Sequence, residues 1–331
     1  MELTFMKKFR VLSDLHLDPN INGLYPLEIK DKEIFTVLCG DTAGEPDIGH
    51  EWISRNVKRG IVVNGNHMPY NFSGKTMQEQ REDLARKYPI DSDISYLDVE
   101  IGNFKKEVDG ILFIGTCMYS NMKVSDPHNP FGDVNINKMT AKRKMNDYRF
   151  GIKEKKWPLG SDNSPSFVYI TPSDYEEWFN NAYNAIEQAL NENEALETPK
   201  PVVLITHFPL IKKMMEESYY DSVRNNYASY GNDMETWIAK HSSIRCYCCG
   251  HTHDVKPDTR CFKIFHADGT HCLVVNNARG YVDYGHHFNF NPDTFVNTSN
   301  WELEQEKELE ETKEAKKRHL AKMIALESFG F

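Results

Sequence analysis

The sequence predicts an α/β fold, and two features of the chain carry this prediction. The first is a set of short runs rich in Val, Ile and Leu, which are typical of buried strands. The second is a set of amphipathic stretches with capping signals, which are typical of helices. The five apolar runs end abruptly at polar residues, and they occupy residues 9–13, 34–39, 61–63, 201–206 and 244–249.

Length and composition are ordinary for a globular protein. The 331 residues are 40% hydrophobic and 27% charged, and the net charge of −10 argues against loose adhesion to long nucleic acid. No apolar run approaches the ~18 residues of a membrane span, so we expect no membrane partner. The N-terminal residues lack an apolar signal core, and seven cysteines without a regular framework suit a reducing compartment. We therefore expect a cytoplasmic protein. Its oligomeric state is not indicated.

The clearest strand end is in residues 61–67, where Ile-Val-Val is followed by Asn64, Gly65, Asn66 and His67. In open α/β sheets, ligands bind just beyond the carboxyl ends of the strands. Core packing alone does not explain why all five runs end on side chains that can coordinate a ligand. The side chains at these ends are Asp14, His16, Asp41, Asn66, His207, His251 and His253.

The chemistry of these side chains favours a metal centre. Mixed imidazole nitrogens and oxygens suit Mn, Fe or Zn. Seven ligands are too many for one such ion and about right for two ions that share a carboxylate. Two metals held ~3.5–4 Å apart can bind an attacking hydroxide and a phosphoryl oxygen together. The sequence therefore predicts two divalent transition-metal ions and the hydrolysis of a phosphoester.

The order of the motifs is D-x-H, G-D, G-N-H, a lone His after a strand, and G-H-x-H. This order resembles the calcineurin-like metallophosphoesterase family over about residues 9–285. The resemblance implies a β-sandwich of two sheets flanked by helices, with the metal centre at one rim. His67 would then be the catalytic proton donor to the leaving oxygen. The resemblance also implies these ligands: Asp14, His16 and His253 for the first metal, Asp41 as the bridge, and Asn66, His207 and His251 for the second.

The sequence departs from the family pattern at two places, and each affects what the resemblance implies. Met68 stands where the family usually has Asp or Glu, which puts the positioning of His67 in question. Residues 40–45 lack the arginine-bearing motif of the eukaryotic-type Ser/Thr protein phosphatases, so we expect a bacterial or phage-type member. The segment around Arg279 is similar to one found after G-H-x-H in some bacterial members. Arg279 could bind a phosphate, and a structural salt bridge is the alternative.

The catalytic domain is expected over residues 1–300, with a cap inserted at about 120–170 and a second insertion at about 210–231. The segment from Lys138 to Lys156 contains eight basic and two acidic residues, which gives it a net charge of +6. One interpretation is a clamp for a phosphorylated substrate, and the alternative is a solvated charged surface. The residues proposed for the clamp are Lys142, Arg143 and Lys144, with Tyr148, Phe150 or Trp157 stacking on a base.

Further elements are expected from local signals. A capping box at 76–79 begins one helix, and Ser173 caps another whose apolar stripe runs from Tyr175 to Leu190. Strands are expected at Ile94–Val99 and Ile111–Met118, with Asp109-Gly110 as a turn signal. The last expected elements are a short helix around Trp237, a hairpin of Cys261–Phe265 with Cys272–Val275, and a C-terminal helical tail over 301–331.

The expected activity is hydrolysis of a phosphomonoester or a phosphodiester. The expected partners are a phosphorylated small molecule or a nucleotide, and short nucleic acid stays open as a substrate. A nuclease or a cyclic-nucleotide phosphodiesterase of the same family is one alternative. A metal-binding scaffold protein without catalysis is the alternative from another class.

Overall fold

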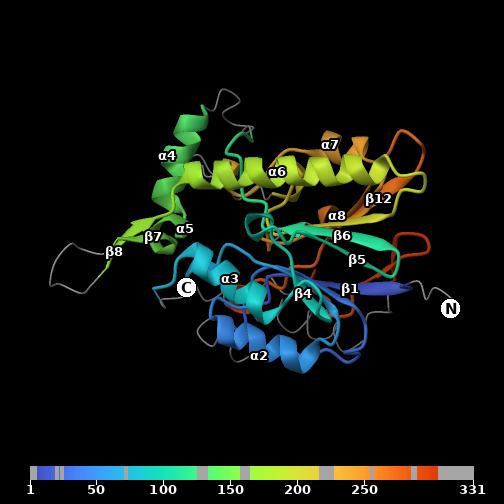
Figure 1. The fold of residues 1–331 in the computed structure, drawn as a ribbon, viewed down its shortest axis with the longest axis horizontal. Helices are drawn as coiled ribbons and strands as arrows, with labels where there is room; N and C mark the ends of the chain where they lie inside the picture. Colours follow the sequence, from blue (N-terminus) through green and yellow to red (C-terminus); the bar gives the residue numbers. More distant parts are fainter. Residues whose placement is uncertain are drawn as a thin grey trace, which may run out of the picture.

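The computed structural model describes residues 6–18, 22, 26–70, 74–124, 133–156, 165–215, 227–253, 257–284 and 289–304. Within these ranges, two six-stranded sheets pack face to face, and helices cover their outer faces (Figure 1). This is a mixed α/β architecture of two sheets flanked by helices, as the sequence predicts. None of the described helices is long and apolar enough to cross a membrane.

The first sheet has the strand order β14-β13-β1-β2-β3-β4. Strands β1 to β4 are parallel, and β13 and β14 continue the sheet in antiparallel pairing. The carboxyl ends of the four parallel strands therefore meet at one rim. The strands are β1 (Lys8–Leu12), β2 (Thr36–Cys39), β3 (Gly60–Val63), β4 (Ile94–Tyr96), β13 (Phe295–Asn297) and β14 (Glu302–Glu304).

The second sheet has the order β11-β12-β10-β9-β6-β5. Its four central strands are parallel, and β11 and β5 pair with them as antiparallel edges. The strands are β5 (Lys105–Val108), β6 (Ile111–Thr116), β9 (Val202–Thr206), β10 (Ile244–Cys249), β11 (Cys261–Phe265) and β12 (His271–Asn276).

The helices lie in two outer layers. Helices α2 and α3 cover the first sheet, and α6 and α7 cover the second (Figure 1). The helices are α2 (Pro46–Asn56), α3 (Met77–Lys87), α4 (Val134–Lys144), α5 (Asp147–Phe150), α6 (Pro172–Glu194), α7 (Glu235–Lys240) and α8 (Pro257–Arg260). Single 3₁₀ turns are η1 (Met68–Tyr70), η2 (Val99–Ile101), η3 (Lys212–Met214), η5 (Tyr227–Ser229) and η6 (Val282–Tyr284).

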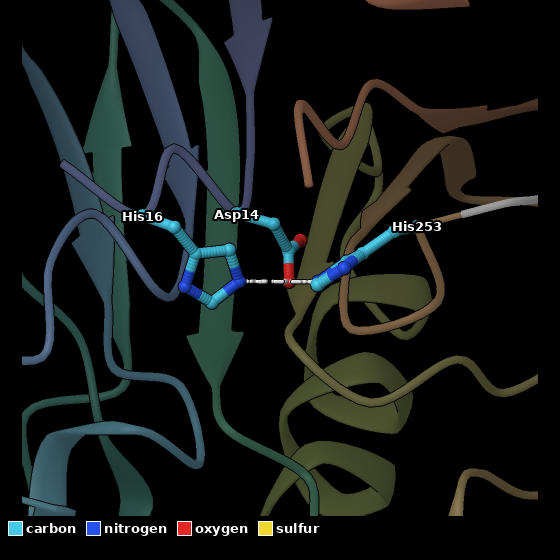
Figure 2. A group of neighbouring side chains, drawn as sticks. All are labelled: Asp14, His16 and His253. Carbon is cyan, nitrogen blue, oxygen red and sulfur yellow. Dashed lines mark hydrogen bonds and ion pairs between the residues drawn. The ribbon is translucent and has the colours of Figure 1, made fainter. Parts of the chain in front are cut away.

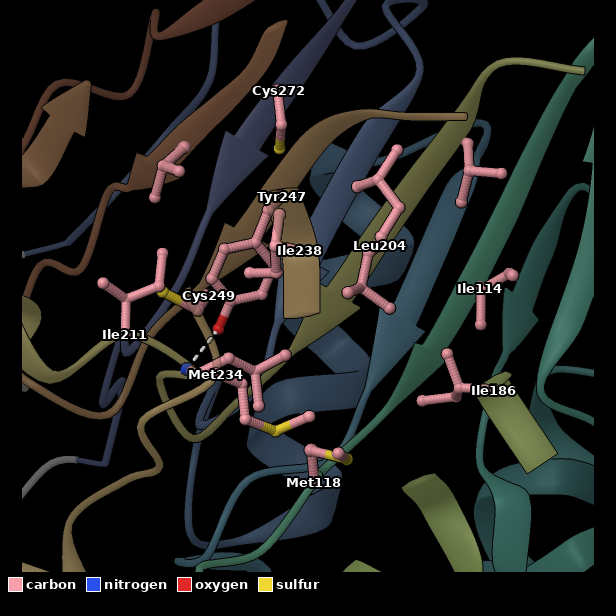
Figure 3. Packing of buried hydrophobic residues seen from close by; sticks show 14 of the residues in the cluster. Ile114, Met118, Ile186, Leu204, Ile211, Met234, Ile238, Tyr247, Cys249 and Cys272 are labelled. Atoms are coloured by element: carbon pink, nitrogen blue, oxygen red, sulfur yellow. Dashed lines mark hydrogen bonds between the residues drawn. The ribbon is translucent and has the colours of Figure 1, made fainter. Parts of the chain in front are cut away.

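Strand alternation divides the core into layers. Successive side chains of a strand point to opposite faces, so β9 serves two clusters. Val203 and Ile205 pack between the sheets with residues of the first sheet. Leu204 lies on the outer face, in one buried cluster with Ile186 of α6 and residues of the neighbouring strands (Figure 3). Because both faces of β9 are covered, its sequence is a continuous apolar run.

Most of the expected elements are present, with shifted ends. Thr76 and Glu79 form the predicted capping box of α3. Helix α6 begins earlier than expected, since Thr171 is its N-cap and Pro172 takes the first helical position. The expected stripe of α6 is confirmed as core, and the predicted hairpin of β11 and β12 is confirmed as well.

Three expectations are wrong in detail. The strand at Ile94 ends at Tyr96, because the Asp98 side chain caps a 3₁₀ turn there. Asp109-Gly110 is a turn with positive φ at both residues, but it joins β6 to the charged edge strand β5, which we did not predict. The tail is not helical at 302–304, because β14 pairs with β13; residues 305–331 lie outside the described part.

The described part of the first insertion is ordered into α4, α5 and a hairpin of β7 (Ile152–Lys156) with β8 (Ser166–Tyr169). It stands beside the N-terminal end of α6 (Figure 1). Its apolar side chains, including Ala141, Met145 and Tyr148, share one buried cluster with Met68 and Met77 of the main domain. The insertion is therefore packed onto the domain near the end of β3. Half of the second insertion, residues 216–226, lies outside the described residues.

Candidate metal centre

The structure brings all the predicted ligands and His67 to one rim. β1 leads to Asp14 and His16, β2 to Asp41, and β3 to Asn66 and His67. The second sheet contributes His207 after β9, and His251 and His253 after β10. Each residue follows the carboxyl end of a parallel strand, which is why strands far apart in the sequence deliver side chains to one place. The seven predicted ligands are all buried.

The backbone turns sharply at these strand ends. Asp14, His16, Asp41 and His251 have positive φ values of 50°, 44°, 48° and 66°. This left-handed conformation is unfavourable for residues with a Cβ, and such strain concentrates at functional sites. The glycine of G-N-H has a different reason: a Cβ on Gly65 would overlap the Asp41 carboxylate. The motif therefore needs glycine so that β3 can approach β2 closely.

The first group of side chains is Asp14, His16 and His253 (Figure 2). The two histidine Nε2 atoms lie 3.1 Å apart, and His253 Nε2 lies 3.0 Å from Asp14 Oδ1. The backbone N–H of His251 donates to both Asp14 oxygens at 3.1 and 2.9 Å, which holds the carboxylate in place. One ligand atom from each of the three residues lies within 4.8 Å of the others, so the group could hold a metal ion.

The second group surrounds Asn66 Oδ1. His207 Nε2 lies 2.9 Å from this oxygen and 3.2 Å from Asp41 Oδ2, and His251 Nδ1 lies 3.0 Å from it. His207 Nδ1 lies 2.9 Å from the carbonyl oxygen of Cys39, which only a protonated Nδ1 can satisfy. In the neutral imidazole, Nε2 then carries a lone pair that faces two acceptor oxygens.

This convergence of acceptors tests whether a metal fits. Asp41 Oδ2 is buried and lies 3.2 Å from His207 Nε2, but it accepts no well-aligned hydrogen bond from any described residue. Buried polar atoms normally have partners, and a cation is a partner for several acceptors at once. Imidazole nitrogens with carboxylate and amide oxygens are a donor set for Mn, Fe or Zn. The residues present therefore fit the metals that the sequence predicts.

The electrostatics of the first group favour free ligand atoms. Burial and the charges of His67 and His253 lower the pKa of His16 well below its usual range, so its imidazole stays neutral. Burial by itself would raise the pKa of Asp14, but the hydrogen bond from His253 and the charge of His207 lower it below its usual range. An ionised carboxylate and a neutral imidazole are the forms that bind metals.

The second group behaves similarly, with one difference. Burial and the charge of His207 lower the pKa of His251. The charges of His207 and His67 overcome burial and lower the pKa of Asp41. Burial would lower the pKa of His207, but the Asp41 carboxylate raises it to about 9. Without a metal, His207 therefore keeps a proton that a metal ion would have to displace.

His67 lies within reach of the same site. Its Nε2 atom is 4.0 Å from Asp41 Oδ2 and 3.4 Å from the Tyr281 hydroxyl, and its side chain is 18% exposed. It also forms a group with His16 and Asp41 whose ligand atoms lie within 4.8 Å of one another. The position suits a proton donor, and it is also close enough for a metal ligand. Its catalytic role stays a prediction.

The predicted substrate contacts lie in different environments. Arg279 is buried, donates to the Leu15 carbonyl oxygen at 3.4 Å, and has a pKa lowered to about 10 by burial. Lys142, Arg143 and Lys144 form the exposed last turn of α4. Phosphate binding by these residues stays a prediction.

Part of the basic charge of the insertion is neutralised. Lys138 pairs with Glu176, Lys153 with Asp174, and Lys155 with Glu79. Tyr148 is buried, so it cannot stack on a base; Phe150 is 37% exposed, and Trp157 lies outside the described residues.

Sequence reasoning missed Asp147 of α5. Its carboxylate is buried and accepts hydrogen bonds from Asn66 Nδ2 at 3.2 and 3.3 Å, from the Tyr175 hydroxyl at 2.7 Å, and from the Tyr70 hydroxyl. Burial raises the pKa of Asp147, although the hydrogen bonds from Tyr70 and Tyr175 act in the opposite direction. One signal could have found it: Asp147 is one of two acidic residues in a strongly basic segment.

Comparison with known proteins supports the fold. No family model matches the chain, and no curated protein matches it. Among solved structures, it is similar to the phosphopantetheinyl hydrolase PptH from Mycobacterium tuberculosis, with a TM-score of 0.55 and 17% identity. The match covers 83% of this chain and 90% of that chain. At this identity the similarity shows a shared fold.

A second similar structure is a dimetal phosphatase from Danio rerio, with 12% identity and a TM-score of 0.38. That match covers 81% of this chain and 87% of the other. At this TM-score, however, the second similarity adds nothing to the evidence from the fold and the site.

Proposed function

We propose that this protein is a metallophosphoesterase that hydrolyses phosphoesters with two divalent transition-metal ions. One observation carries the proposal: His207 Nε2 lies 2.9 Å from Asn66 Oδ1 and 3.2 Å from Asp41 Oδ2 in a buried site. Without a metal this nitrogen keeps a proton between the two oxygens, and a bound cation would take the place of that proton. The site lies at the strand ends where α/β proteins bind ligands.

The proposed division of ligands follows the two groups. Asp14, His16 and His253 would hold one metal, and Asn66, His207 and His251 the other, with Asp41 between them. Asp14 also forms a group with Asp41 and His207, so both carboxylates lie between the two sets of imidazoles. When bound, two such ions lower the pKa of water and neutralise charge on a phosphoryl group.

His67 is proposed to give a proton to the leaving oxygen. Its side chain is partly exposed. The centroid of its ring lies 4.7 Å from that of His16 and 4.5 Å from that of Tyr70. Its backbone N–H donates to Asp41 Oδ1 at 3.0 Å, which fixes the start of the turn that carries it. The imidazole is therefore held beside the proposed metal ligands while part of its side chain stays exposed.

Space for the organic part of a substrate lies next to Asp41. A cavity of about 410 Å³ extends between α2 and α3, over the ends of β2 and β3. Its size is within the range of small-molecule sites. Apolar residues such as Ile53 and Leu84 line it together with Lys75 and Lys87. We propose a phosphorylated small molecule or a nucleotide as the substrate, and short nucleic acid stays open.

A two-part experiment tests the proposal. The metal content of the purified protein is measured, and activity with added Mn²⁺ is measured on a panel of phosphomonoesters and phosphodiesters. We expect about two bound ions per chain and hydrolysis of at least one class. Bound metal without any turnover would favour the non-catalytic scaffold. Rates on an aryl phosphate and its bis-aryl counterpart then separate monoester from diester preference.

A further inference from the structure

Asp147 of the insertion contacts the metal centre from outside. Three donor groups surround its two oxygens: the Asn66 amide reaches both, the Tyr70 hydroxyl reaches Oδ1, and the Tyr175 hydroxyl reaches Oδ2. An ionised carboxylate only accepts hydrogen bonds, so each of these groups must donate to Asp147. Asp147 itself belongs to none of the groups of possible metal ligands among the described residues.

The contact determines which way the Asn66 amide faces. The two ends of an asparagine amide are similar in shape, and only hydrogen bonding selects one orientation. The carboxylate of Asp147 attracts the NH₂ end, so Oδ1 must face His207 Nε2 and His251 Nδ1. A reversed amide would place two N–H donors at the position proposed for the second metal.

We propose that Asp147 is a positioning residue: it orients Asn66 Oδ1 toward the second metal, and the insertion is therefore part of the metal centre. The inference rests on the proposed function. It adds that the site is completed by a segment outside the strand-end motifs. Carboxylates that orient ligands in this way change metal affinity typically by 10–100-fold when they are removed.

The position of Met68 agrees with this inference. Met68 directly follows His67, and its side chain is buried in the cluster that includes Met145 and Tyr148 of the insertion. An acidic side chain at this position would be buried among apolar side chains. The chain thus uses position 68 to hold the insertion, and the insertion supplies the carboxylate to Asn66.

The test compares Asp147→Asn with the wild type. Mn²⁺ affinity is measured by calorimetry on metal-free protein, and kcat and KM are measured on an aryl phosphate. We expect about 10- to 100-fold weaker binding of the more weakly held ion, because the new amide can present an N–H to Asn66 and allow the ligand amide to reverse. At saturating Mn²⁺, kcat should recover most of its value, with KM little changed.

Tyr148→Phe is the matched control on the same short helix. Its hydroxyl is buried and has no hydrogen-bond partner among the described residues, so its removal should leave Mn²⁺ affinity and activity unchanged. If Asp147→Asn does not fold, Tyr175→Phe replaces it. That change removes one donor to Asp147 and should weaken Mn²⁺ binding by about 2- to 10-fold.

The outcomes separate the two proposals. Wild-type protein that binds no Mn²⁺ overturns the proposed function. Wild-type protein that binds Mn²⁺, with unchanged affinity in Asp147→Asn, overturns only the role of Asp147. An equal loss of affinity in Tyr148→Phe also overturns that role, because it would show that any disturbance of α5 has the same effect.

Discussion

The Nε2 atoms of His16 and His253 lie 3.1 Å apart in a buried site, although 237 positions separate the two residues. Two imidazole nitrogens at this distance are compatible only if at most one carries a proton. Asp14 Oδ1 lies 3.0 Å from the same nitrogen of His253, so three atoms compete for that proton. A divalent cation can satisfy all three together, and this gives a direct expectation for metal binding.

The first prediction concerns stability. Added Mn²⁺ should raise the melting temperature of metal-free protein, because a ligand that binds only the folded state stabilises it by about 4 kcal/mol at 1,000 times its Kd. Scanning calorimetry before and after treatment with a chelator measures the effect. An unchanged melting temperature at millimolar Mn²⁺ would contradict the metal centre.

The second prediction concerns the carboxylate between the two groups. Asp41→Asn should lower both metal content and aryl phosphate hydrolysis, the latter by at least about 10²-fold, because charge is removed next to both ions. Asp109→Asn is the matched control, since Asp109 has a similar φ of 50° against 48° but lies in the β5–β6 turn. Full activity in Asp41→Asn would contradict the proposed function.

The third prediction concerns His67. A general acid contributes about 10²–10⁴-fold, most for a poor leaving group. His67→Ala should therefore slow alkyl phosphates far more than nitrophenyl phosphates. Metal content should stay unchanged, and this readout is decisive because His67 lies close enough to His16 and Asp41 to be a ligand. Loss of an ion in the variant would show that His67 binds metal.

The fourth prediction concerns the basic end of α4. Changing Lys142, Arg143 and Lys144 together to Ser should raise KM for a nucleotide and spare a small aryl phosphate. The wild type should show a steeper salt dependence with the larger substrate, because exposed charges are screened beyond ~8 Å at physiological ionic strength.

A control for this variant removes the same charge elsewhere. Lys32, Lys58 and Arg59 are exposed and precede β2 and β3, at the rim opposite the strand ends. Their joint change to Ser should leave both KM values unchanged. If the α4 variant behaves in the same way at low salt, its basic turn is only a solvated surface.

Local signals in the sequence were sufficient for the parallel strands of the rim and for the polar side chains at their ends. A continuous apolar run such as Val202–Thr206 indicates a strand covered on both faces, and His207 directly after it lies at a strand end in any arrangement of the sheets. The capping box at Thr76 is equally local. These features depend on residues that are neighbours in the chain, so the sequence by itself determined them.

Only the tertiary structure decided what depends on residues far apart in the chain. The edge strand β5 has no apolar alternation, and its pairing with β6 defines it. β14 exists because β13 offers a free edge, which overrides the helical pattern expected from Trp301. The contact of Asp147 with Asn66 crosses 81 positions, and it arises because Met68 and the insertion bury apolar surface together. Spacing in the sequence does not record such packing, so this part of the site required the folded chain.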